Sequence, residues 1–252
     1  MTPRFDRPIA HRGLHDRSAG RIENSSAAFE ATIAAGFSIE CDVQLSADGV
    51  PFVFHDDNFE RLTGYSGLAG SLPMAEIERL PLTGSSPPET PQRLVAFLAQ
   101  VAGRTPIQIE LKPQPTPEAT TRLAAGVCEA LQSYTGEVTL ESFDPNLLIA
   151  LRREGARWPL GILVSAYREA GDRNLSATTR FALRNLLHWP WTRFAFISCY
   201  HQDLNLPAVR FFRALGMPVT AWTIRSEAHG RTALLHSDQI VFEGHLPLHV
   251  TG

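Results

Sequence analysis

The sequence lacks features that are typical of several protein classes, and their absence narrows the range of functions that the protein could have. Its three cysteines are widely spaced and odd in number, which predicts buried thiols in a reducing compartment rather than a disulfide framework or a zinc site. A formal net charge of -3 lacks the basic surplus of a general nucleic-acid binder. No apolar run approaches the roughly 18 residues of a membrane span, and the opening "MTPRFDRPIA" has no apolar signal-peptide core. We therefore expect a soluble, cytoplasmic protein with no nucleic-acid partner and no transmembrane segment.

What is present predicts a globular α/β protein. With 252 residues, 44% of them hydrophobic, the chain has the size of one α/β barrel or of two small domains. Short runs rich in β-branched or aromatic residues alternate with segments that have helical spacing. This alternation favours a single (β/α)8 TIM-barrel domain over residues 1–252. The eight expected strands are 8–13, 37–44, 106–112, 138–143, 159–165, 194–200, 218–224 and 239–244.

One segment breaks the alternation. "VPFVFHD" follows the second expected strand after only "SADG", which is too short for a crossover helix, so it must return antiparallel as a hairpin arm. A long irregular stretch rich in Gly, Pro and Ser comes next, before one amphipathic helix. Such a stretch is typical of a functional loop or cap, and we expect a small insertion at approximately 57–90.

Polar residues lie near the carboxyl ends of the first three barrel strands, where such barrels place their active sites. Two-residue periodicity puts Glu40 and Asp42 on one strand face, and Glu110 with Lys112 on another. Acidic groups that point into a barrel are costly unless they are paired or bind a cation. The first strand ends in His11 and Arg12, which would meet them at the same mouth.

The register of the hairpin decides where His55 lies. A two- or four-residue loop at "SADG" pairs positions whose numbers sum to an odd value, which puts His55 on the face of Glu40 and Asp42. A three-residue loop with a bulge would instead put His55 on the apolar face with Cys41. We expect the odd-sum register.

This set of residues suggests metal-assisted phosphodiester cleavage. Three hard oxygen ligands, Glu40, Asp42 and Glu110, suit Mg²⁺ or Ca²⁺ better than zinc. Two histidines without a nucleophile elbow suggest general acid and base catalysis. Positive charge at the same mouth, from an arginine and a lysine, would hold an anionic, phosphate-like group.

The motifs in order resemble the glycerophosphodiester phosphodiesterase family along nearly the whole chain. They are "AHRG", "ENSSAAF", "ECDVQLSADGVPFVFHD", "IELK", "ESFDP" and "AWTI". The resemblance implies a TIM-barrel enzyme that uses one divalent cation, Mg²⁺, Ca²⁺ or Mn²⁺, to hydrolyse glycerophosphodiesters to sn-glycerol 3-phosphate and an alcohol.

The resemblance also implies a role for each motif residue. His11 and His55 would form the acid–base pair, and Glu40, Asp42 and Glu110 would be the metal ligands. The substrate and its phosphate would be contacted by Arg12, Lys112, Asn24 and Trp222. Three of these have other interpretations: Asn24 is also a favoured helix N-cap, Lys112 could be the salt-bridge partner of Glu110 or Asp42, and Trp222 also suits the core.

Several alternatives remain open at this point. Arg225 stands where similar enzymes carry asparagine, and Glu243 where they carry Thr-Asp, which puts the leaving group in doubt. A lysophospholipase D-like reaction would fit an apolar rim on the inserted segment, for which Leu62, Tyr65, Leu68, Leu72 and Met74 are candidates. A barrel that binds a phosphodiester without cleaving it would not need two proton-transfer histidines.

Overall fold

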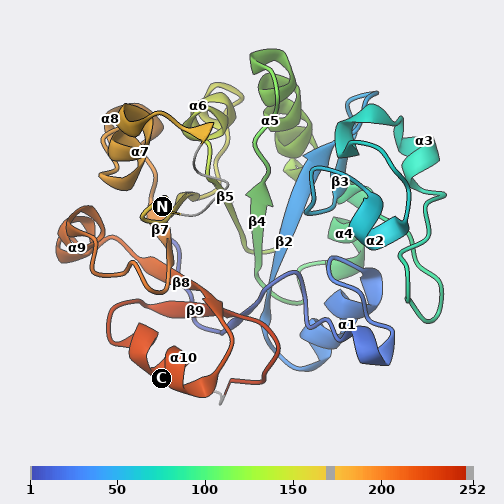
Figure 1. The fold of residues 1–252 in the computed structure, drawn as a ribbon, viewed down its shortest axis with the longest axis horizontal. Coiled ribbons are helices and arrows are strands. Elements are labelled where there is room, and N and C mark those ends of the chain that lie inside the picture. The colour runs from blue at the N-terminus through green and yellow to red at the C-terminus, as the bar shows by residue number, and fades with distance from the viewer. Residues whose placement is uncertain (1, 169–173, 248–252) are drawn as a thin grey trace.

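The fold is a closed barrel surrounded by helices (Figure 1). The structure is a computed structural model that describes residues 2–168 and 174–247. Eight parallel strands close into the barrel because β1 pairs with both β2 and β9, and β3 adds antiparallel to β2. The predicted (β/α)8 barrel with a hairpin arm is therefore confirmed. The strands are β1 (Ile9–Ala10), β2 (Ser38–Leu45), β3 (Pro51–Val53), β4 (Ile107–Leu111), β5 (Val138–Ser142), β6 (Leu160–Val164), β7 (Phe196–Tyr200), β8 (Val219–Ile224) and β9 (Gln239–Phe242).

The helices lie outside the strands, and their ends follow local capping rules. The first long helix begins after Ser25, whose side chain accepts a hydrogen bond from the amide of Ala28, and the chain leaves it through Gly36 at φ +77°. The helices are α1 (Ser26–Ala34), α2 (Glu60–Thr63), α3 (Met74–Ile77), α4 (Leu94–Val101), α5 (Pro117–Leu131), α6 (Pro145–Arg153), α7 (Ala177–Arg184), α8 (Trp189–Thr192), α9 (Pro207–Ala214) and α10 (Glu227–Leu234), with 3₁₀ turns η1 (Arg17–Ala19) and η2 (Ala69–Ser71).

The apolar core lies between the strands and the helices, whereas the barrel interior is largely polar. On β2 the apolar residues Ile39, Cys41 and Val43 belong to the core, and the intervening Glu40 and Asp42 are buried on the other face. All three cysteines are free; Cys41 and Cys199 are buried, as predicted, whereas Cys128 is only partly buried. The interior of the barrel therefore provides buried polar groups at the end where β1, β2 and β4 finish.

The hairpin register differs from the prediction. The pairs are Val43 with Val53 and Gln44 with Phe52, so paired numbers sum to an even value. Ser46 pairs with Val50 through a backbone hydrogen bond of 3.1 Å, which leaves a three-residue loop whose last residue, Gly49, has φ +85°. This is the loop with a left-handed residue that shifts the register by one. The expected odd-sum pairing, from which we derived the face of His55, is therefore wrong.

His55 nevertheless reaches the acidic face, because β3 ends before it. The strand stops at Val53, and the side-chain amide of Gln44 donates to the carbonyls of His55 and Asp56 at 3.4 and 3.2 Å. Strand alternation governs side-chain direction only while the chain stays in the sheet. The position of His55 is therefore set by the loop that follows the arm.

The segment between β3 and β4 folds around a small hydrophobic core of its own, beside the hairpin arm (Figure 1). That core consists of Ile22, Phe52, Phe54, Phe59, Leu62, Ala69, Met74, Ile77 and Leu82. Leu62 and Met74 are almost fully buried in it, so they cannot belong to an apolar rim. Only Tyr65 and Leu68, of the five rim candidates, are exposed. The lysophospholipid alternative thus loses two of its five candidate rim residues.

Candidate active site

Three carboxylates meet inside the barrel mouth. Glu40, Asp42 and Glu110 come from neighbouring strands, since Asp42 is aligned with Glu110 in the β2–β4 register. One oxygen from each lies within 4.8 Å of the others, and all three side chains are buried. Oxygen ligands at this spacing are what hard divalent cations such as Mg²⁺ or Ca²⁺ prefer. The prediction that these three residues lie close together is confirmed.

The electrostatics of the cluster favour a bound cation. Burial raises the pKa of Glu40 well above its usual value, and the charges of Asp42 and Glu110 raise it further. Burial also raises the pKa of Glu110. One oxygen of Asp42, Oδ1, is buried and accepts no hydrogen bond within the described residues. Buried acceptors without donors are costly, so these residues fit a divalent cation that would satisfy them.

A fourth carboxyl lies next to the cluster. Glu141 on β5 is aligned with Glu110 and is buried, and it accepts a hydrogen bond from the side-chain amide of Gln108 at 2.8 Å. Burial raises the pKa of Glu141 to about 8. Its carboxyl is therefore mainly protonated at neutral pH, and it adds little negative charge to the three acidic ligands.

Two cations and an amide contact the cluster from its edges. Lys112 Nζ lies 2.8 Å from Glu110 Oε1 and 3.4 Å from Asp42 Oδ1, and these charges raise the pKa of Lys112 despite its burial. Arg12 Nε lies 3.4 Å from Asp42 Oδ2. Asn24 Nδ2 donates to the same oxygen at 2.9 Å. Asn24 therefore orients a carboxylate of the cluster, and the N-cap of α1 is Ser25 instead.

The tight turn after β1 places the arginine. Arg12 adopts φ +57° and Gly13 φ +78°, and the backbone amide of Arg12 donates to Glu40 Oε2 at 2.7 Å. A Cβ at residue 13 would lie 3.0 Å from side-chain atoms of Ala28 and Phe29, so the left-handed conformation and the close approach both require glycine there. The "HRG" step thus fixes the backbone that holds Glu40.

His11 lies at the end of β1 and is paired with Glu243, which follows β9. Its Nδ1 is 2.7 Å from Glu243 Oε2, and that oxygen is 3.3 Å from Arg225 Nη2. Burial lowers the pKa of His11, and the hydrogen bond to Glu243 partly offsets this. The hydrogen bond from His11 lowers the pKa of Glu243 to about 2. The two departures from the family pattern therefore contact each other, and one of them holds a candidate proton-transfer residue.

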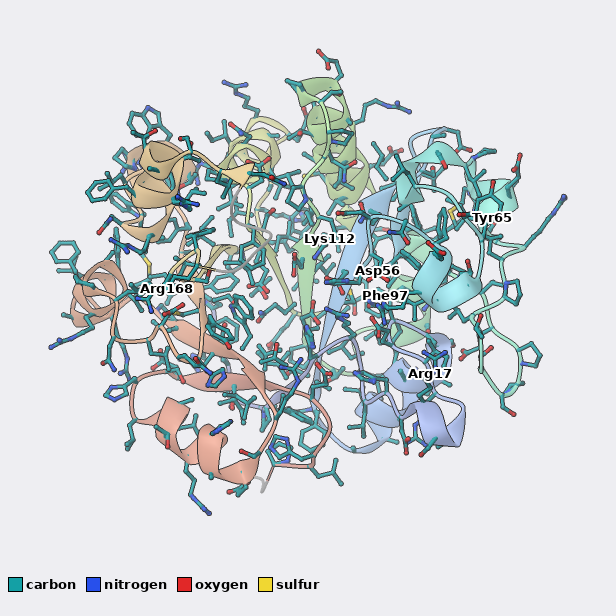
Figure 2. All side chains as sticks on the ribbon, in the orientation of Figure 1. Arg17, Asp56, Tyr65, Phe97, Lys112 and Arg168 are labelled. Atoms are coloured by element: carbon teal, nitrogen blue, oxygen red, sulfur yellow. The ribbon has the colours of Figure 1, made fainter. Side chains whose placement is uncertain are left out.

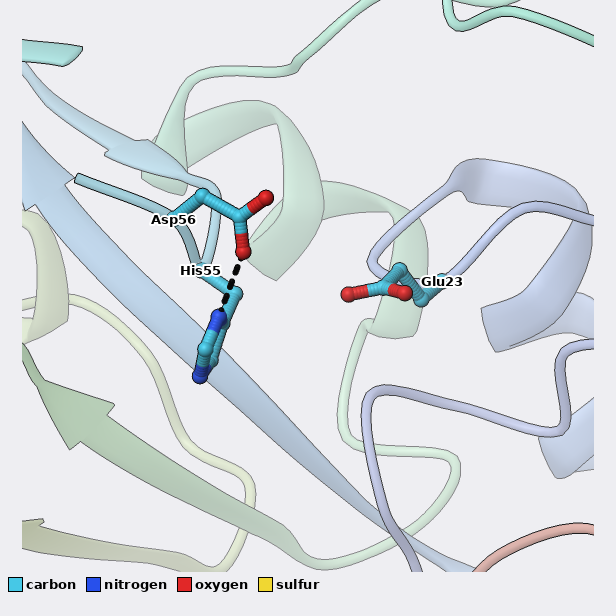
Figure 3. Close-up of side chains that lie close together, drawn as sticks. All are labelled: Glu23, His55 and Asp56. Atoms are coloured by element: carbon cyan, nitrogen blue, oxygen red, sulfur yellow. Dashed lines mark hydrogen bonds and ion pairs between the residues drawn. The ribbon is translucent and has the colours of Figure 1, made fainter. Parts of the chain in front are cut away.

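His55 lies in the loop after β3 and is paired with Asp56, as Figure 3 shows. Its Nδ1 is 2.7 Å from Asp56 Oδ1, and Glu23 faces the pair. In Figure 2, Asp56 and Lys112 lie toward the centre of the molecule, whereas Tyr65 lies farther out. His55 is also among the charges that lower the pKa of Asp42 despite its burial. The loop therefore brings the second histidine to the acidic cluster.

Each histidine uses its Nδ1 in the same way. An ionised carboxylate only accepts hydrogen bonds, so the Nδ1 that contacts it must carry the proton. In a neutral ring this leaves the lone pair on Nε2. Within the described residues, no hydrogen bond to either Nε2 is found, so both atoms remain available to a substrate.

Trp222 lies in an aromatic wall at the ends of the strands from the second half of the barrel. Its ring packs against Phe143 and Tyr200 with centroid separations of 5.4 and 5.3 Å, and its Nε1 donates to the carbonyl of Ser198 at 3.0 Å. The clustered carboxylates and the two cations beside them come from β1, β2 and β4 or the residues directly after them. The mouth thus has a charged side and an aromatic side, as a ligand with an ionic and a less polar end would need.

Sequence reasoning missed three residues of the charged side. Asp56 was not among the predicted site residues, but its side chain is only 16% exposed and holds His55. Glu23 accepts from Arg12 Nη1 at 2.6 Å, and Arg61 donates to both Glu23 and Asp56. The available signals were the acidic residue beside Asn24 and the acidic residue directly after His55.

A cavity of about 670 Å³ opens at the opposite end of the barrel, near the starts of the strands. Its lining includes Phe5, Ile9, Ser38, Pro106 and Pro159, and none of the three clustered carboxylates. Chemistry nevertheless favours the mouth, because the three clustered carboxylates lie there and barrel enzymes use the carboxyl ends of their strands.

Comparison with known proteins agrees with this geometry. The model of the glycerophosphoryl diester phosphodiesterase family matches residues 11–242. A relative from Bacillus subtilis (strain 168), named as a candidate glycerophosphodiester phosphodiesterase, YhdW, is 25% identical over 87% of this chain and 86% of its own.

Solved structures share the fold. A phosphodiesterase from Oleispira antarctica, solved in complex with the product sn-glycerol-3-phosphate, has a TM-score of 0.76 at 23% identity and covers 96% of this chain and 92% of its own. A glycerophosphodiester phosphodiesterase from Thermotoga maritima has a TM-score of 0.69 at 24% identity, with coverage of 93% and 92%. No helix in the described part of the chain has the length and hydrophobicity needed to cross a membrane.

Proposed function

Because the chain belongs to the glycerophosphoryl diester phosphodiesterase family, a family of phosphoric diester hydrolases, we propose that it hydrolyses glycerophosphodiesters to sn-glycerol 3-phosphate and an alcohol. The observation that carries the proposal is the meeting of three buried carboxylates with two histidines whose Nδ1 atoms are each held by a carboxylate. That arrangement combines a cation site with two proton-transfer groups, as this reaction requires.

The cation would be held by Glu40, Asp42 and Glu110. When bound, it supplies positive charge that offsets the negative charge developing on the phosphate oxygens. All-oxygen ligands favour Mg²⁺, Ca²⁺ or Mn²⁺. The fit rests on the raised pKa values of Glu40 and Glu110 and on the unsatisfied oxygen of Asp42.

The phosphate would be held by Arg12 and Lys112. Both already contact carboxylates, but each has donors to spare. Arg12 donates through Nη1 to Glu23 and its Nε lies 3.4 Å from Asp42 Oδ2, which leaves other N–H groups of its five-donor guanidinium for a phosphate. Lys112 makes one short contact, to Glu110, and its ammonium carries three protons. Asn24 would act by orienting Asp42, and Trp222 would pack against the glycerol end of the substrate.

The two histidines would divide the proton transfers. One removes the proton of the attacking hydroxyl, which belongs either to water or to the substrate's own 2-hydroxyl through a cyclic phosphate. The other donates a proton to the oxygen of the leaving alcohol. We favour His11 as the base, because burial lowers its pKa and so keeps Nε2 unprotonated at neutral pH. His55 would then be the acid.

The test is coupled detection of glycerol 3-phosphate released from glycerophosphocholine or glycerophosphoethanolamine, with and without EDTA. We expect turnover that chelation abolishes and that added divalent cation restores. Absence of turnover on a panel of diesters would refute the activity. Turnover that survives both EDTA and His11→Ala would refute the mechanism.

A further inference from the structure

One arginine of the inserted segment is bound to two carboxylates of the site. Arg61 in α2 donates from Nε and Nη2 to the two oxygens of Asp56, at 2.6 and 2.8 Å. It donates from Nη1 and Nη2 to the two oxygens of Glu23, at 2.8 and 2.7 Å. Both contacts are bidentate, the geometry in which a guanidinium fixes the orientation of a carboxylate.

Each of these carboxylates also holds a residue of the proposed reaction. Asp56 Oδ1 accepts from His55 Nδ1 at 2.7 Å, and Glu23 Oε1 accepts from Arg12 Nη1 at 2.6 Å. A continuous chain of hydrogen bonds therefore runs from His55 through Asp56, Arg61 and Glu23 to Arg12. It joins the proton-transfer side of the site to the phosphate-binding side.

The guanidinium also occupies the place where a second cation would otherwise fit. Ligand atoms of Glu23, His55 and Asp56 lie within 4.8 Å of one another, which is close enough to hold a metal ion. Arg61 already supplies positive charge to both carboxylates. Although burial alone would raise the pKa of Glu23, its contacts with Arg61 and Arg12 lower that pKa to about 2. We therefore assign this position to Arg61 rather than to a metal.

The backbone that carries Arg61 is firmly held. The neighbouring Phe59 and Leu62 are almost fully buried in the second hydrophobic core, whereas the Arg61 side chain is 45% exposed. An ion pair with an exposed partner adds little to folding stability. The network is thus better suited to fixing side chains than to stabilising the fold.

We infer that Arg61 is a positioning residue, through which the inserted segment holds His55 and Arg12 in place for the reaction. The inference rests on the proposed function for what these two residues do. Arg61 itself does not contact the acidic cluster in any interaction found among the described residues. Its effect would pass through Asp56 to the proton transfer and through Glu23 to the phosphate.

The first test compares Arg61→Met with Arg93→Met. Arg93 is a matched control, because it makes a bidentate contact with Glu78, at 2.7 and 2.8 Å, and contacts neither histidine. We expect Arg61→Met to lower kcat by about 10- to 100-fold and to raise KM several-fold, since small misplacements of reacting groups are costly. Arg93→Met should stay within about twofold of the wild type in both parameters. Both variants should keep a Tm within about 4 °C of the wild type.

A mutant cycle then separates the effect that passes through Asp56 from the effect that passes through Glu23. Asp56→Asn should reproduce mainly the loss in kcat, and Glu23→Gln mainly the rise in KM. Adding Arg61→Met to the variant that carries both changes should cause no further loss beyond about twofold, because Arg61 would no longer have a carboxylate to act through. Full additivity would show that Arg61 acts by another route and would overturn the inference.

A measurement without turnover keeps the inference independent of the proposed activity. The ¹⁵N resonances of the His55 ring, assigned with His55→Ala, should show the Nδ1-protonated tautomer in the wild type and a mixture in Arg61→Met. Arg93→Met should match the wild type. If the wild type cleaves no diester but the ring resonances respond as expected, the proposed function fails and the positioning role stands. If the wild type is active and Arg61→Met behaves like Arg93→Met in kcat, KM and resonances, the positioning role fails alone.

Discussion

The two histidines are held by similar contacts that have different origins. Both bind a carboxylate through Nδ1 at 2.7 Å, but the side chain of His11 is 15% exposed and that of His55 is 30% exposed. His11 and its partner Glu243 follow directly after β1 and β9, which pair with each other in the barrel. His55 and Asp56 lie in a loop outside the barrel strands.

This difference explains why the two partner carboxylates have different supports. The barrel already fixes Glu243, and Arg225, which contacts it at 3.3 Å, is 63% exposed. Asp56 has no strand to hold it and is gripped at both oxygens by Arg61. The inserted segment, which has its own hydrophobic core, thus holds the carboxylate partner of His55 in place, as the pairing of β1 with β9 does for the partner of His11.

Removal of either histidine should have the largest effect. His11→Ala and His55→Ala should each lower kcat for glycerophosphocholine by about 10²- to 10⁴-fold, as expected for the loss of a general acid or base. The exposed His236→Ala serves as a control and should leave kcat unchanged. If one of the two site variants kept near-normal activity, the two halves of the site would not share the proton transfers.

Loss of one carboxylate of the cation site should affect the proton transfers of both histidines at once. Glu110→Gln removes a negative charge from the cation site but keeps its shape, so we expect weaker Mn²⁺ or Mg²⁺ binding by calorimetry. Turnover at low metal concentration should fall by about 10²-fold and recover partly when more metal is added. Normal metal binding by this variant would show that the cation is held elsewhere.

The pH profile should distinguish the two histidines. Burial lowers the pKa of His11, so the acidic limb of kcat/KM should have its midpoint below pH 6.5 if His11 is the base. Glu243 raises that pKa, and therefore Glu243→Gln should move the midpoint to still lower pH. Asp56→Asn should leave this limb in place. A limb that moved with Asp56→Asn instead would exchange the roles of the two histidines.

The smallest effect should come from the outer support of His11. Arg225→Ala removes an exposed, single contact to a carboxylate that the barrel already holds, so kcat and KM should each change by no more than about twofold. Steady-state kinetics beside Arg61→Met give the comparison directly. Equal losses of activity in Arg225→Ala and Arg61→Met would mean that the barrel strands do not hold Glu243 beside His11 without Arg225.

The barrel and its acidic cluster were predictable from the sequence because they depend on local periodicity. Alternation along β2 and β4 placed Glu40, Asp42 and Glu110 on inward faces, and eight strand-like runs became the eight barrel strands. These features need no knowledge of long-range contacts.

The parts that could not be predicted depend on one-residue choices or on distant partners. The register of the arm turned on whether Gly49 would form a three-residue loop, and "SADG" permits either outcome. The pairing of Glu23 with Arg61 joins residues 38 positions apart in the sequence, and no local pattern links them. Leu62 and Met74 resembled surface residues of a loop because the second core forms only after that segment folds.

The hairpin arm has a consequence for how this protein tolerates change. Although β3 ends at Val53, the amide of Phe54 still donates to the carbonyl of Asp42, so His55 lies one residue past the paired part of the arm. The tip of the arm is held as well, because the amide of Ala47 donates to the carbonyl of Leu72 and Asp48 Oδ1 accepts from the amide of Met74. A codon gained or lost at that tip would therefore disturb the inserted segment, from which Arg61 holds Asp56 beside His55.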